Sequence, residues 1–195
     1  MKKLVYIVPH LSTGKAPQYL LKQLQNIISD YETYVIEWED VTGGKLVIQR
    51  NQIISLLPSS NFYTLGENKT ILLNILQKIQ PDIVHMAEIP EFFMPDEIAK
   101  YIYADARKYT ILETSYDSSF DTSLKRYFPD KFLFVSKWQI EQYKDINVPK
   151  YLLEYPIEYC DERPDRETAL RKLGLDPDKK HILHVGLFTP RKNQS

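Results

Sequence analysis

The chain has 195 residues, a formal net charge of -1, 43% hydrophobic residues and 26% charged residues. This composition is typical of a globular protein with a buried core, and the balanced charge gives no support to a binder of nucleic acid. The single cysteine, Cys160, excludes an intrachain disulfide, and without a CxxC or HExxH motif no zinc site is indicated. The apolar run at residues 4–8 is too short for a signal peptide or a membrane span, which predicts a cytoplasmic protein.

Short apolar runs alternate with segments of helical spacing along the chain. The run at residues 4–8 is typical of a strand covered on both faces, and the S-x-x-Q pattern from Ser136 to Gln139 is a capping box that begins a helix. The predicted strands span residues 4–8, 34–38, 46–48, 62–64, 82–86, 109–112, 132–135, 151–153 and 181–185. The predicted helices span residues 16–28, 69–80 and 95–106, with further helices from Ser136 and at 169–173. This alternation predicts an α/β fold with a doubly wound, Rossmann-like parallel sheet.

A polar stretch from Glu158 to Arg166 follows the main run of strands and helices and is typical of a linker between domains. We therefore expect one Rossmann-like domain at residues 1–158. The helix and strand behind the stretch look like the start of a second such domain. Residues 159–195 are thus expected to be a linker and the beginning of a truncated second domain.

The loop after the first strand is the first candidate binding element, because open parallel sheets bind ligands beyond the carboxyl ends of their strands. It carries His10, Gly14 and Lys15 at the start of a helix, where free backbone N–H groups could hold an anion or a sugar hydroxyl. The loop matches neither GxGxxG nor GxxxxGK[ST], so no dinucleotide or triphosphate site is indicated. Ser12 and Thr13 have an alternative explanation as N-caps of the helix, without any ligand contact.

Later strand ends carry further candidates. His85 ends a buried strand, where a histidine is either functional or a hydrogen-bonded core residue. Ser115, Tyr116 and Asp117 follow the next strand and offer hydroxyl, phenol and carboxylate groups that suit a polyol, although serine and aspartate also fit a turn. Ser136 follows the strand after that. We expect all of these residues and the first loop to line one cleft.

Six short motifs succeed one another along the chain. They are PDIVH at 81–85, VSKW at 135–138, YPIE at 155–158, LRKLGL at 170–175, ILHVG at 182–186 and PRKN at 190–193. In order and spacing they resemble glycosyltransferases of the GT4 type and GT-B fold. In that family, two Rossmann-like domains face each other across a cleft, the N-terminal one holding mainly the acceptor and the C-terminal one mainly the nucleotide-sugar donor.

The resemblance implies a retaining glycosyltransferase that moves a sugar from a nucleotide-diphosphate sugar to a hydroxyl of a glycan, lipid or small-molecule acceptor. It implies no cofactor, no metal and no nucleic-acid partner, and it leaves open the oligomeric state, peripheral membrane contact and the catalytic residues. Acceptor binding would fall to the N-terminal candidates above, and donor-phosphate binding to Gly186, Arg191 and Lys192. Lys192 matches the family's phosphate-contacting lysine, and a cation there would stabilise charge on the leaving diphosphate.

The chain departs from the family pattern at three loops. Lys15 stands where many members have the second glycine of a pair, Leu187 where many have arginine, and Tyr116 where many have the histidine of a T-x-H-D motif. The last difference leaves the identity of the acceptor open. The alternative functions are a non-catalytic module that binds a sugar or a partner, and another GT-B or Rossmann enzyme that acts on sugar nucleotides.

Overall fold

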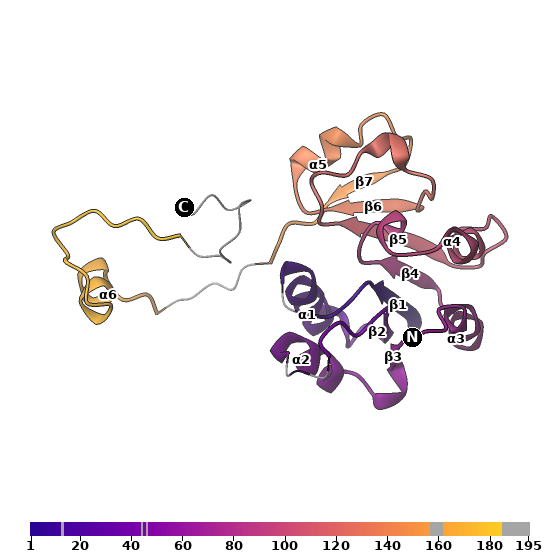
Figure 1. The fold of residues 1–195 in the computed structure, drawn as a ribbon, viewed down its shortest axis with the longest axis horizontal. Coiled ribbons are helices and arrows are strands. Elements are labelled where there is room, and N and C mark those ends of the chain that lie inside the picture. Colours follow the sequence, from indigo (N-terminus) through magenta and orange to yellow (C-terminus); the bar gives the residue numbers. More distant parts are fainter. Residues whose placement is uncertain (13, 44, 46, 157–161, 185–195) are drawn as a thin grey trace. The chain divides into compact units, whose positions relative to one another are not determined.

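A seven-stranded parallel sheet organises the protein, as seen in a computed structural model that describes residues 1–195 except 13, 44, 46, 157–161 and 185–195 (Figure 1). The strand order is β3-β2-β1-β4-β5-β6-β7, and every pair of neighbours is parallel. The α/β, Rossmann-like fold predicted from the sequence is therefore confirmed. The strands are β1 (Lys2–Val8), β2 (Tyr31–Glu37), β3 (Phe62–Thr64), β4 (Ile83–Met86), β5 (Thr110–Ser115), β6 (Lys131–Phe134) and β7 (Lys150–Leu152).

Helices cover both faces of this sheet. The chain runs outward from β1 to β3, crosses back to β4 and then runs outward in the opposite direction. Right-handed crossovers therefore place α1 and α2 on one face and α3 and α4 on the other (Figure 1). No helix in the described part of the chain is long and apolar enough to cross a membrane. The helices are α1 (Lys15–Ile27), α2 (Ile48–Leu56), α3 (Ile71–Ile79), α4 (Asp96–Ile102), α5 (Lys137–Gln142) and α6 (Arg166–Lys172).

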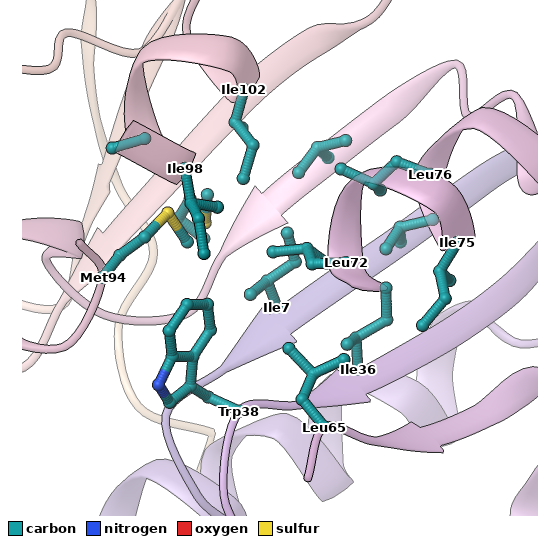
Figure 2. Packing of buried hydrophobic residues seen from close by; sticks show 14 of the residues in the cluster. Ile7, Ile36, Trp38, Leu65, Leu72, Ile75, Leu76, Met94, Ile98 and Ile102 are labelled. Atoms are coloured by element: carbon teal, nitrogen blue, oxygen red, sulfur yellow. The ribbon is translucent and has the colours of Figure 1, made fainter. Parts of the chain in front are cut away.

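The largest hydrophobic cluster lies under α3 and α4. Ile7 of β1 and Ile36 of β2 point to this face and meet Leu72 of α3 and Ile98 of α4 (Figure 2). Trp38 closes the cluster at the carboxyl end of β2. Each fully buried side chain of this kind stabilises the fold by about 1.5–3 kcal/mol relative to an exposed one, so this layer holds the sheet and the two helices together.

The helix predicted at residues 69–80 is confirmed as α3, which spans Ile71–Ile79. Leu72, Ile75, Leu76 and Ile79 are the buried residues of that helix. The helix ends where Gln80 adopts the left-handed conformation, with φ of 54°. The following Pro81 disfavours helical geometry in the residue before it, which explains the sharp stop.

The expected strand at residues 46–48 is wrong at Ile48, which instead begins α2; Leu46 lies outside the described residues. Helix α2 buries a single residue, Ile53, and Ile48 is 64% exposed. With so narrow a buried face, the segment has almost no apolar periodicity from which a helix can be predicted.

Residues 157–195 form a second compact unit, separate from the unit of residues 1–156. Its helix α6 is capped by Asp165, whose carboxylate accepts a hydrogen bond from Thr168 N at 2.9 Å, and it ends before Gly174 with φ of 69°. The strand expected at 181–185 is wrong for the described residues 181–184, where Ile182 and Leu183 are 99% and 87% exposed. A strand needs a neighbour to pair with, and no described segment pairs with this one.

Candidate functional site

The loops that carry the predicted site meet at one edge of the sheet. Strands β1, β4, β5 and β6 are consecutive neighbours, and all point the same way. Near their carboxyl ends, Ile7 is in register with Met86, and Ser115 with Phe134. The segments that follow these strands therefore leave the sheet side by side, which is where open α/β sheets bind ligands.

Positive groups gather at the start of α1. Gly14 is the N-cap residue with φ of 140°, a conformation that favours glycine, and it brings no side chain to satisfy the first N–H groups of the helix. Lys15 is exposed, and its ammonium group donates to the carbonyl of Tyr116 at 3.4 Å. The lysine thus joins two segments that are 101 residues apart in the sequence.

Glu88 faces this lysine from the segment after β4. Burial raises the pKa of its carboxyl group, and the charge of Asp117 adds to the rise, while the N–H groups of Ile89 and Tyr116 and the charge of Lys15 oppose it. The hydrogen bond from Ile89 N measures 3.0 Å. Glu88 follows His85 closely in the sequence, but acidic residues in loops are usually only solvated, so the sequence alone did not favour it as a site residue.

Tyr116 and Asp117 differ in their surroundings: Tyr116 is packed in the protein, whereas Asp117 belongs to a turn. Tyr116 is buried, with 7% of its surface exposed, and its ring lies edge-on to Tyr19 at 5.5 Å. Asp117 accepts hydrogen bonds from Ser119 N and Ser119 Oγ at 2.5 and 2.6 Å, and these bonds lower the pKa of its carboxyl group. Asp117 therefore stabilises a turn, as serine and aspartate often do. It is also a charged group at this edge of the sheet.

Ser115 and Ser136 both form hydrogen bonds that hold the loop after β5 and the start of α5 in place. Ser136 caps α5 by accepting from Gln139 N at 3.3 Å, as the capping box predicts. Gln139 is buried, and its amide donates to the carbonyls of Ser115 and Asp117 at 3.0 and 3.2 Å. Ser115 is also buried and donates to the Asp117 carbonyl. Gln139 thus holds the backbone of residues 115–117 in place. Nothing in the sequence indicated this role, because Gln139 lies more than 20 residues after that segment.

His10 lies in the first loop, half-buried, with its Nδ1 atom 2.8 Å from the hydroxyl of Ser12. This contact keeps the imidazole at the same edge as Lys15. Ser12 therefore bonds to the histidine, and Gly14 takes the N-cap position of α1.

Glu37, at the carboxyl end of β2, is a buried carboxylate that the sequence reasoning missed. It accepts from Leu11 N at 2.9 Å, from Thr64 Oγ1 at 3.0 Å and from the Arg50 guanidinium, whose Nη2 atom lies 2.8 Å from Oε2. In dinucleotide-binding Rossmann domains an acidic residue near this position binds the ribose. Here the carboxylate is occupied by protein groups, and it ties the first loop to β2.

His85 is the penultimate residue of β4 and lies on the α1 face of the sheet. Its Nε2 atom is 2.8 Å from Thr114 Oγ1, its ring packs against Tyr6 at 4.8 Å, and it is 2% exposed. Burial lowers the pKa of the imidazole to about 3, so the ring is neutral. It lines an open, mostly apolar pocket of about 340 Å³ beside α1 together with Leu112 and Leu133. Of the two interpretations of His85, a hydrogen-bonded core residue describes it better than a functional one.

The residues assigned to donor phosphates, Gly186, Arg191 and Lys192, lie outside the described residues. Among the described residues, no group of three or more His, Cys, Asp or Glu side chains comes together as a metal site would require. Comparison with protein-family models and with curated proteins gave no match. Function is therefore inferred from the geometry of the sheet edge and from the motifs of the chain itself.

Proposed function

We propose that this chain is the N-terminal, acceptor-side half of a retaining glycosyltransferase of GT-B fold. The enzyme would transfer a sugar from a nucleotide-diphosphate sugar to an acceptor hydroxyl. The observation that supports this most is the meeting of Lys15, Glu88 and Asp117 at the carboxyl edge of a Rossmann-like sheet. The six ordered motifs, which resemble the GT4 type, supply the reaction class.

The chemistry of this edge suits an acceptor with several hydroxyl groups. A sugar or polyol both donates and accepts hydrogen bonds, so it is recognised best by neighbouring donors and acceptors. Lys15 and the first N–H groups of α1 are donors, whereas Glu88 and Asp117 are acceptors. The proposal covers a glycan, a lipid-linked or a small-molecule acceptor.

The competing assignment to a dinucleotide enzyme has less support. The first loop lacks the glycine pattern, and Glu37 already binds Arg50 and the backbone of Leu11. A ribose would have to displace an ion pair between the buried Glu37 and the partly buried Arg50, which would leave the arginine without its partner. The donor would instead bind the second domain, where the resemblance assigns Lys192 to its phosphates.

The proposal is tested by incubating the full-length protein with a panel of nucleotide-diphosphate sugars and hydroxylated acceptors while release of the nucleotide is measured. Lys15→Ala should raise the acceptor KM roughly 10- to 100-fold, because a hydrogen bond to a charged group is worth about 1.5–3 kcal/mol. Donor affinity, measured by calorimetry, should stay unchanged. Lys78→Ala, at an exposed position on α3, is the matched control.

Two results would contradict the assignment. Loss of donor binding in the Lys15→Ala variant would show that the donor binds the N-terminal domain and that its assignment to the second domain is wrong. Saturable binding of sugars without turnover of any donor in the panel would instead favour the non-catalytic sugar-binding module.

A further inference from the structure

A charge cluster is buried beneath the loop that joins β5 to β6, residues 116–130. Lys125 of this loop donates to Glu91 Oε2 at 2.8 Å and to Glu113 Oε2 at 2.9 Å. The side chains of Lys125 and Glu113 are 0% exposed and that of Glu91 is 5% exposed. The three residues come from the loop, from the turn η2 (Pro90–Phe92) and from β5, so the cluster joins three segments near the carboxyl edge.

The protein offers more hydrogen-bond donors to the carboxylate of Glu91 than to that of Glu113. Glu91 Oε1 also accepts from Arg126 N at 2.8 Å and from Tyr127 N at 3.1 Å. Glu113 Oε2 accepts a second hydrogen bond from the Tyr103 hydroxyl at 3.2 Å, but its Oε1 atom has no partner among the residues that the structure describes. A negative charge is therefore well stabilised on Glu91 and poorly stabilised on Glu113.

The other ionisable groups around Glu113 do not supply a second positive charge. Tyr103, which follows α4, and Tyr143, which follows α5, both face it, and burial raises the pKa of each phenol. Arg107, in the turn before β5, influences Tyr103 but forms its ion pair with Asp130 at 2.8 Å. Two ionised carboxylates around one ammonium group would thus leave an excess negative charge in a buried site, which is strongly unfavourable.

Protonation of Glu113 removes that excess charge. Burial raises the pKa of the Glu113 carboxyl to about 7, against the attraction of Lys125. For Glu91 burial acts in the same direction, but Lys125 and the hydrogen bonds outweigh it and lower the pKa. The proton is therefore held by Glu113, and Lys125 is neutralised by Glu91.

We propose that Glu113 is a pH-sensitive anchor of the β5–β6 loop: protonated, it allows Lys125 and Glu91 to hold the loop closed, and ionised, it favours local opening around residues 125–127. The closed loop binds the proton more tightly than the open one, where Glu113 would regain an ordinary carboxyl group. Opening therefore becomes more favourable as pH rises from the ordinary glutamate range towards neutrality. The inference does not depend on glycosyl transfer, although the same loop carries Tyr116 and Asp117.

Amide hydrogen exchange measures this opening directly. The N–H groups of Arg126 and Tyr127, which bind Glu91, should show an opening constant that increases on the order of tenfold between about pH 5.5 and 7.5, after correction for the intrinsic exchange rate. The amide of Ala87, which directly follows β4 and bonds to Ile7 O of the neighbouring β1 at 2.9 Å, should not follow this change.

The variant Glu113→Gln carries a permanently neutral side chain of the same shape. Its loop should stay closed and lose the pH dependence. Glu141→Gln, at an exposed carboxylate of α5 that pairs with Lys144, is the matched control and should keep the wild-type response.

A second measurement needs no variant. Carbon-13 NMR of the Glu113 carboxyl carbon in the wild-type protein should titrate near neutral pH. A midpoint close to the ordinary glutamate pKa of about 4.3 would overturn the proposal. So would exchange at Arg126 and Tyr127 that is independent of pH, or a Glu113→Gln protein that keeps the full pH response.

Discussion

Removal of the Arg50 side chain should destabilise the protein strongly, because it leaves the Glu37 carboxylate buried without its cation. Glu37 is 0% exposed and the Arg50 side chain is 17% exposed. Breaking a buried ion pair by removing one partner costs about 3–5 kcal/mol. Leu11 N and Thr64 still donate to the carboxylate, so we expect Arg50→Ala to lose about 3 kcal/mol, at the low end of that range.

The assay is equilibrium urea unfolding of Arg50→Ala and of the double variant Glu37→Gln with Arg50→Ala. The double variant should be more stable than Arg50→Ala alone, because its neutral amide needs no cation and still accepts from Leu11 N. Arg126→Ala, which breaks the exposed pair with Asp96, is the control and should lose only about 0.2–1 kcal/mol. A loss below about 1 kcal/mol in Arg50→Ala, or a double variant less stable than the single one, would refute the reasoning.

Four further outcomes are expected. Leu72→Ala should lose about 2–5 kcal/mol in urea unfolding, because Leu72 is fully buried on the sheet-facing side of α3. Gln139→Ala should lower the melting temperature and increase hydrogen exchange at Asp117 and Ser119, since two carbonyls lose their donor. His85 should stay neutral in NMR titrations down to about pH 4, and its lowered pKa should contribute a loss of stability as pH falls from about 6.5 towards 3. Lys192→Ala should reduce turnover in the proposed sugar transfer on the order of 10²–10³-fold with little change in folding.

The fold could be predicted well wherever the sequence carries a strong local pattern. Leu72, Ile75 and Leu76 repeat at helical spacing, and Pro81 marks the end of that helix. Helix α2 could not be predicted in this way, because it buries only Ile53. For residues 181–184 the apolar composition was misleading, since a strand also depends on a partner that composition does not reveal.

From the sequence it could be predicted which segments meet at the carboxyl edge of the sheet, but not which residues hold them there. Strand ends identified Lys15, Tyr116 and Asp117, because the carboxyl ends of parallel strands share an edge. The residues that hold these segments in place were not visible, since their partners are distant in sequence. Glu37 binds a backbone group 26 residues away and Lys125 binds Glu91 across 34 residues, and a charged residue in a polar stretch gives no sign that it is buried.

The groups proposed to contact a ligand lie on loops or in the first turn of α1, whereas the hydrophobic clusters that stabilise the unit lie on the two faces of the sheet. Substitutions at Lys15 or Asp117 can therefore alter what the edge recognises without loosening the layer around Leu72. Substrate preference in such a protein is free to diverge through a few loop changes, at little risk to folding. Proteins descended from the same ancestor would accordingly share the buried faces of the sheet more faithfully than the chemistry along its rim.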